Sequence, residues 1–131
     1  MFIVTHQPSS CVAVFERQPF WGPELQRHFI DRQIAVRECR SLNDLVPAIR
    51  EFSKAVMLIV LDSAPAECLK WLEDFAATDY HVPRIVVASA EFNQFEWLIR
   101  ESGGIFVDDE LPRGRVAKLC ERHLNPSLSR R

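Results

Sequence analysis

The chain has 131 residues, which is the length of one compact domain. Its 16 basic and 18 acidic side chains leave a formal net charge of -2, so it lacks the basic excess that general nucleic-acid binding requires. Hydrophobic residues make up 47% and charged residues 26%, as in globular rather than disordered chains.

Short apolar runs predict five strands, each followed by a stretch with helical spacing. The run 55–61 is the most apolar and is the candidate for the central strand. The run 33–39 alternates more and is expected nearer a sheet edge. The strands are predicted at 11–16, 33–39, 55–61, 84–89 and 104–108.

Helices are predicted between and after these strands. The first carries the stripe Trp21, Leu25 and Phe29. The second has two candidate caps, Ser41 and Asn43. Asn43 is preferred because a helix that starts there has Pro47 near its first turn, where proline is tolerated. The remaining three are expected from residue 65, over about 92–101, and over 116–124.

Five β–α units in series predict an α/β fold with a parallel sheet and helices on both faces. The expected domain covers residues 11–124, with an N-terminal extension at 1–10 and a flexible tail at 125–131. In such sheets the working crevice lies at the carboxyl ends of the strands.

The sequence also limits the cell compartment and the chemistry. No apolar run approaches the ~18 residues of a membrane span, and the first residues lack the features of a signal peptide, so a cytoplasmic protein is expected. The scattered cysteines are interpreted as small buried hydrophobes, not as metal ligands or disulfides. The four histidines suggest no catalytic set, and no glycine-rich phosphate loop is present. We therefore predict no enzymatic activity and no cofactor. The cysteines are Cys11, Cys39, Cys68 and Cys120.

The residues at the carboxyl ends of the predicted strands lie at the edge where the crevice is expected, and most of them are polar. These residues are Glu16, Arg17, Asp62, Ser89, Ala90 and the acidic run 108–110. In their order they resemble the receiver domain of bacterial two-component response regulators. The resemblance covers residues 11–124 and implies a flavodoxin-like sheet of order 2-1-3-4-5.

The resemblance also implies roles for particular positions. In receivers an Asp ending strand 3 accepts phosphate from a histidine kinase, and Asp62 stands there. Ser89 matches the strand-4 hydroxyl that contacts the phosphate, and Phe106 matches the switching aromatic of strand 5.

Two other positions depart from the receiver pattern. Receivers have a pair of acids at the end of strand 1 that holds Mg²⁺. Here the first position is Glu16, but the second is the cation Arg17. The lysine three positions after Phe106 is replaced by Asp109. Phosphoryl transfer depends on neutralising charge around the transferred group, so these changes predict a degenerate receiver, or pseudo-receiver. Arg17 is expected to form a charge pair with Asp62 and to compete with Mg²⁺.

Each site residue also has a structural interpretation. Asp62 is either a phosphoacceptor or a strand-end acid satisfied by Arg17 or by the turn at Ser63. Glu16 is interpreted as a solvent-exposed acid, and the Ser89 hydroxyl as bonding to loop backbone. Phe106 is interpreted as core filling. Glu16 and Asp62 are weak candidates for Mg²⁺, with help from the acidic run.

One aromatic residue is predicted to face solvent. Phe92, Phe95, Leu98, Ile99 and Ser102 share the arc of the fourth helix that faces the sheet, and Trp97 projects from the other side. An exposed Trp often anchors an interface, so a homodimer or a docked protein partner is expected around Trp97. Arg100 and Glu101 would form its polar rim.

The sequence thus favours a stand-alone degenerate receiver-like module that acts through protein–protein interaction. The alternative is a competent receiver phosphorylated on Asp62 by a histidine kinase. A third possibility is a small-molecule sensor that uses the acidic crevice.

Overall fold

A five-stranded sheet forms the centre of the molecule, which a computed structural model describes for residues 9–124. All pairings are parallel, and the strand order is β2-β1-β3-β4-β5. The α/β class and the order 2-1-3-4-5 are therefore confirmed. The strands are β1 (Ser10–Phe15), β2 (Ile34–Cys39), β3 (Lys54–Val60), β4 (Arg84–Ala88) and β5 (Gly104–Asp108).

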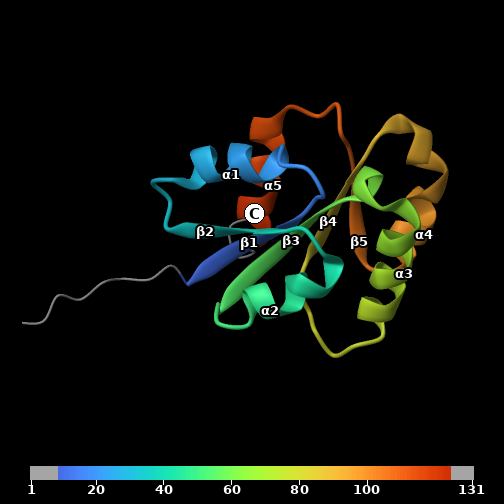
Figure 1. The fold of residues 1–131 in the computed structure, drawn as a ribbon, viewed down its shortest axis with the longest axis horizontal. Helices are drawn as coiled ribbons and strands as arrows, with labels where there is room; N and C mark the ends of the chain where they lie inside the picture. Colours follow the sequence, from blue (N-terminus) through green and yellow to red (C-terminus); the bar gives the residue numbers. More distant parts are fainter. Residues whose placement is uncertain (1–8, 125–131) are drawn as a thin grey trace, which may run out of the picture.

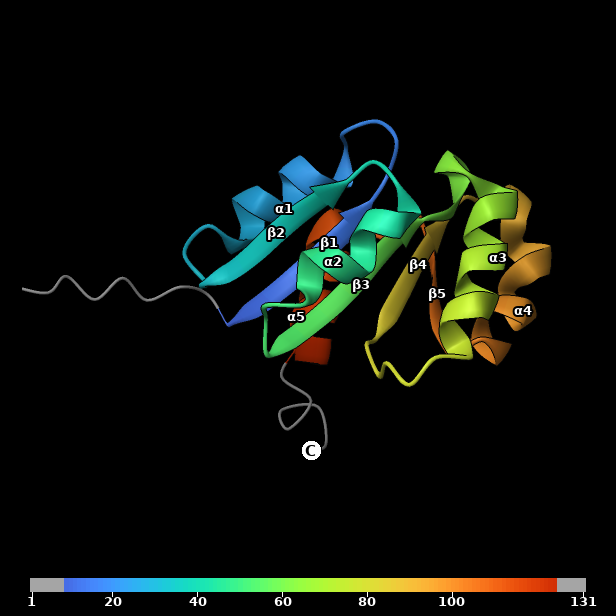
Figure 2. The same ribbon diagram turned by 60° about the horizontal axis from the view of Figure 1, so that its bottom comes forward.

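The helices cover both faces of the sheet (Figure 1). On one face lie α1 (Trp21–Phe29) and α5 (Arg113–Leu124). On the other lie α2 (Leu45–Ile49), α3 (Pro65–Ala76) and α4 (Glu96–Glu101). Figure 2 shows α2 over β1 and β3, and α3 and α4 farther along the sheet beside β4 and β5.

Side-chain alternation along the strands divides the core into two layers. Ala13 and Phe15 pack toward α2 and α3, and Val12 and Val14 pack toward α1 and α5. Central strands buried on both faces explain the continuous apolar runs in the sequence.

The second helix begins differently from its prediction. A 3-10 turn at Leu42–Asp44 precedes α2, and the side chain of Ser41 accepts a hydrogen bond from the Asn43 N–H. The preference for Asn43 as the cap was therefore wrong. The turn places Pro47 third in α2, where its missing N–H costs no helical hydrogen bond.

The fourth helix begins as a 3-10 helix at Ala90–Phe95 and becomes α-helical at Glu96. Trp97 is 62% exposed, as predicted, and Ile99 is buried. Leu98 was expected to face the sheet but is 41% exposed. The 3-10 segment advances by about 120° per residue instead of 100°, which shifts the phase of the helix that follows it.

The four cysteines lie in the core as predicted, and none of them forms a disulfide. Burial raises the pKa of Cys11, Cys68 and Cys120 to about 12 and that of Cys39 to about 11, so all four remain protonated thiols at neutral pH.

Within the described range, no helix has the length and apolar character that crossing a membrane requires. Ser10, placed in the predicted N-terminal extension, is the first residue of β1. The rest of that extension up to residue 8, and the predicted tail at 125–131, lie outside the described residues.

Candidate functional site

The candidate site lies at the carboxyl ends of β1 and β3. The chain leaves β1 toward β2 on one side and later returns to β3 on the other, so a crevice opens between the two strands. An open cavity of about 520 Å³ occupies this position. Its lining includes Glu16, Arg17, Asp62 and Asp109, four of the residues singled out from the sequence.

Glu16 directly follows β1, and its side chain turns into the protein. Both carboxylate oxygens accept hydrogen bonds from the first N–H groups of α1: Oε1 from Trp21 at 3.0 Å, and Oε2 from Phe20 at 3.0 Å and Gly22 at 2.9 Å. The residue is 2% exposed. Its negative charge also lies at the positive end of the helix dipole. Glu16 therefore closes the amino end of α1 from outside the helix.

This position corrects the prediction that Glu16 is a solvent-exposed strand-end acid. The residue before the helix is Phe20, whose side chain caps nothing. The free N–H groups at the start of a helix need acceptors when they are buried. Among the described contacts, the side chain that accepts them is Glu16, at the end of the preceding strand.

Arg17 makes contacts other than the predicted one. Its guanidinium pairs with Glu67 on α3 at 2.6 Å, and its backbone N–H donates to Ser63 Oγ at 3.1 Å. The ion pairs described for residues 9–124 do not include one between Arg17 and Asp62. The prediction of a charge pair between these two residues was therefore wrong. The cation is drawn to α3 because Glu67, in its first turn, is exposed on the same side.

Asp62 lies on the exposed turn that follows β3. Its Oδ1 accepts a hydrogen bond from the Ser89 backbone N–H at 3.0 Å, which ties the ends of β3 and β4 together. The Ser89 hydroxyl approaches Glu91 Oε1 at 3.5 Å, not the loop backbone that was expected. The structure thus brings Asp62 and Ser89 together, although through the Ser89 backbone.

Asp109 lies beside Asp62 at the same edge. Its backbone N–H donates to the Ala88 carbonyl at 2.9 Å, which fixes the turn after β5. Partial desolvation, and then the charges of Asp62, Asp108 and Glu110, raise the pKa of Asp109. The position where a receiver has its lysine is therefore a site of negative potential.

Phe106 is half-buried and packs against the core between the sheet and α2, α3 and α4. This packing agrees with its interpretation as core filling. Neighbouring Gly104 is closely packed, since a Cβ there would lie 2.8 Å from Ile99 Cγ2.

The residues at this edge do not fit the Mg²⁺ that the receiver resemblance implies. The Glu16 carboxylate is buried and already accepts three N–H groups. Among residues 9–124, no three His, Cys, Asp or Glu side chains are grouped so that they could hold a metal ion. Mg²⁺ requires oxygen ligands in a near-octahedral arrangement, and the two acids left in the cavity, Asp62 and Asp109, do not supply it.

Comparison with solved structures identifies the architecture. The crystal structure of a response regulator receiver protein from Pseudoalteromonas atlantica superposes with a TM-score of 0.72, over 89% of this chain and 98% of that one. The fold is receiver-like. Sequence identity is 13%, so the likeness concerns the fold alone. No family model and no curated protein matches the chain.

Within the receiver-like fold, the predicted interface residues lie on α4. Arg100 pairs with Glu96 at 2.7 Å along the helix, beside the exposed Trp97. Glu101 instead lines a cavity of about 410 Å³ between α3 and α4, where Leu98 also lies.

Sequence reasoning missed a second feature of the same edge. A larger cavity, of about 670 Å³, adjoins the crevice on the side of α2 and α3 and shares Arg17 with it. Its other cations, Arg40 and Lys70, belong to different elements far apart in the sequence. Only the fold brings these residues together, so no local pattern indicated them.

Proposed function

We propose that this chain is a receiver-like signalling module that acts through protein–protein contact and is not switched by an aspartyl phosphate. The observation that carries the proposal is the position of Glu16. In the receiver pattern this acid binds the metal, whereas here its carboxylate closes the amino end of α1. Releasing it to bind a metal would leave buried N–H groups without acceptors.

The charge around Asp62 supports the same proposal. Transfer of a phosphoryl group requires cations near its oxygens. Asp109 contributes a negative charge close to Asp62, and the guanidinium of Arg17, the cation in the cavity lining, contacts Glu67 on α3 instead of Asp62. The exposed Asp62 then acts as a structural link between the ends of β3 and β4.

Intact-mass measurement after incubation with Mg²⁺ and acetyl phosphate tests this proposal. We expect no gain of a phosphoryl group, because the Glu16 carboxylate is held by the N–H groups of α1 and Asp109 stands where a receiver has its assisting lysine. A receiver that accepts phosphate from acetyl phosphate, treated in parallel, is the positive control.

A gain of one phosphoryl group that disappears in Asp62→Asn would refute the proposal. It would favour instead a competent receiver phosphorylated by a histidine kinase. Asp62→Asn is a suitable control because its amide oxygen can still accept the Ser89 N–H, so the ends of β3 and β4 remain joined.

We further propose that the partner, or a second copy of the chain, binds around Trp97. This large side chain is 62% exposed, and the exposed Leu98 lies next to it. Burying a Trp in a well-packed interface contributes about 2–3 kcal/mol. The Glu96–Arg100 pair supplies a polar rim on one side, and a twofold dimer is the commonest arrangement of identical surfaces.

Trp97→Ala is expected to weaken self-association or partner binding while leaving thermal unfolding nearly unchanged. Sedimentation velocity over a concentration series, together with a melting curve, measures both effects. Ile30→Ala is the matched control, since Ile30 is 78% exposed at the end of α1, outside this surface. Unchanged association in Trp97→Ala would exclude this surface.

A further inference from the structure

A cavity lies between the segment that leads into α2 and the part of α3 from Ala66 to Asp74. It has a volume of about 670 Å³ and is open to solvent at the carboxyl edge of the sheet. This volume lies within the roughly 300–1,000 Å³ of small-molecule sites. The space is left because α2 has only five residues and does not extend along α3 (Figure 2).

One wall of the cavity is an aromatic ring that is stacked on other aromatic rings. Trp71 stacks on Phe75, with ring centroids 4.9 Å apart and planes inclined by 15°, and Phe75 stacks in turn on Tyr80. Trp71 lines the cavity and is half-buried. Because the Trp71 ring is already fixed against Phe75, ordering it against a ligand costs little further side-chain entropy in the protein.

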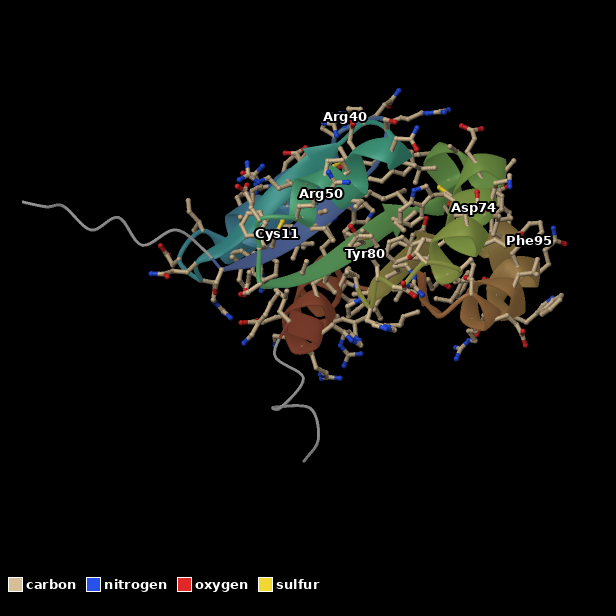
Figure 3. The ribbon with its side chains drawn as sticks, turned by 90° about the horizontal axis from the view of Figure 1, so that it is seen from below. Cys11, Arg40, Arg50, Asp74, Tyr80 and Phe95 are labelled. Carbon is tan, nitrogen blue, oxygen red and sulfur yellow. The ribbon has the colours of Figure 1, made fainter. Side chains whose placement is uncertain are left out.

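Three cations from separate elements line the same space. Arg17 follows β1, Arg40 follows β2, and Lys70 lies on α3 one residue before Trp71. Two hydrogen bonds fix the Arg40 guanidinium, which donates to the Glu16 carbonyl at 3.3 Å and to the Glu38 carboxylate at 3.2 Å. Figure 3 shows Arg40 on the β2 side of the molecule and Asp74 on α3, the two sides that border the cavity.

The acids that line the cavity do not cancel this positive charge. Glu67 pairs with Arg17 at 2.6 Å and Asp74 with Lys70 at 3.3 Å, and all four of these side chains are exposed. Exposed ion pairs of this kind contribute little stability and exchange readily. A guanidinium also has five donor hydrogens, so Arg17 keeps donors for an anion while it contacts Glu67.

We propose that this cavity binds a small planar aromatic anion, with its ring stacked on Trp71 and its charged group held by Arg17, Arg40 and Lys70. The inference goes beyond the proposed function, because it gives the module a chemical input that does not involve Asp62. The bound anion would contact the ends of β1 and β2 and the first turns of α3 together.

NMR titration of the ¹⁵N-labelled protein tests the site with AMP and naphthalene-1-sulfonate as probes. We expect saturable shifts of the Trp71 indole N–H with both probes. Adenosine and inorganic phosphate, which each carry one half of the recognised chemistry, are expected to bind far more weakly. Arg17→Gln combined with Lys70→Gln is expected to weaken binding of both probes about tenfold through loss of charge-assisted hydrogen bonds.

The matched control removes the same charge from the opposite face. Arg115 and Lys118 are exposed on α5, so Arg115→Gln with Lys118→Gln is expected to bind both probes as the native chain does. Trp71→Leu is expected to abolish the stacking contribution, and Trp97→Leu is its control. Should Trp71→Leu fail to fold, the Arg17 and Lys70 variant decides, because both of its side chains are exposed.

Absence of saturable shifts at millimolar probe would overturn the inference. So would equal weakening by the α5 variant, which would indicate attraction to overall charge, or equal binding of adenosine. These readouts use neither phosphorylation nor association, so their failure is distinguishable from failure of the proposed function.

Discussion

Glu16→Ala is expected to lower the free energy of unfolding by about 3 kcal/mol, the largest effect of any substitution at the carboxyl edge of the sheet. The carboxylate accepts three backbone N–H groups at 2.9–3.0 Å and is 2% exposed. Alanine leaves these donors without an acceptor and removes a negative charge from the amino end of α1. Chemical denaturation followed by circular dichroism measures the loss.

Two variants separate the hydrogen bonds from the loss of side-chain volume and from general charge effects. Glu16→Gln keeps the shape but has one acceptor oxygen, so we expect about half of the loss. Glu110→Ala removes an exposed acid from the same edge, and its effect is expected to stay within about 0.5 kcal/mol. If Glu16→Ala cost no more than Glu110→Ala, the carboxylate would not be needed by α1, and the argument against a metal at this edge would fail with it.

The arrangement of the elements was predictable because each apolar run has one stable environment. A run such as 55–61, buried on both faces, fits only the interior of a parallel sheet. Pro65 then starts a helix where the strand has ended. These signals are local, and the parallel order follows from their alternation.

The contacts of the charged residues were not predictable from the same local signals. Two acids follow β3, Asp62 in the 3-10 turn and Glu67 in the first turn of α3, and Arg17 pairs with Glu67. A charge at a strand end indicates the edge where it lies, but its partner depends on how two loops fold past each other.

The function of Glu16 did leave a signal in the sequence. No Ser, Thr, Asp or Asn stands immediately before Trp21, where a helix normally finds its cap, and Phe20 occupies that position. An uncapped amino end next to a buried strand implies an acceptor elsewhere. The acid four residues before Phe20 was the available candidate.

Arg84 is a second charged residue whose position the sequence did not explain. It begins β4 and is 8% exposed, between buried strands and the end of α4. Its guanidinium donates to the carbonyls of Val82 at 3.0 Å and Ser102 at 2.8 Å, and lies 4.8 Å from the centre of the Phe75 ring. Burial lowers the pKa of Arg84, although the group stays charged at neutral pH.

This cation joins three parts of the fold. The Ser102 carbonyl ends α4, where the helix dipole favours a positive charge. Gly103 follows with φ of +85°, and a side chain there would collide with the guanidinium. Arg84 therefore fixes the turn between α4 and β5, and with it the position from which the helix carrying Trp97 is presented.

Arg84→Met is expected to lower the free energy of unfolding by about 2–3 kcal/mol, because two part-buried carbonyls lose charge-assisted donors while the apolar stem is retained. Arg84→Lys keeps one charge but not the forked geometry, so its loss is expected to lie in between. Arg50→Met, on the exposed end of α2, is the control and is expected to change stability by less than about 0.5 kcal/mol. Hydrogen exchange locates the effect: faster exchange at the end of α4 in Arg84→Met supports the link, whereas uniform destabilisation across the sheet would show that Arg84 acts only through core packing.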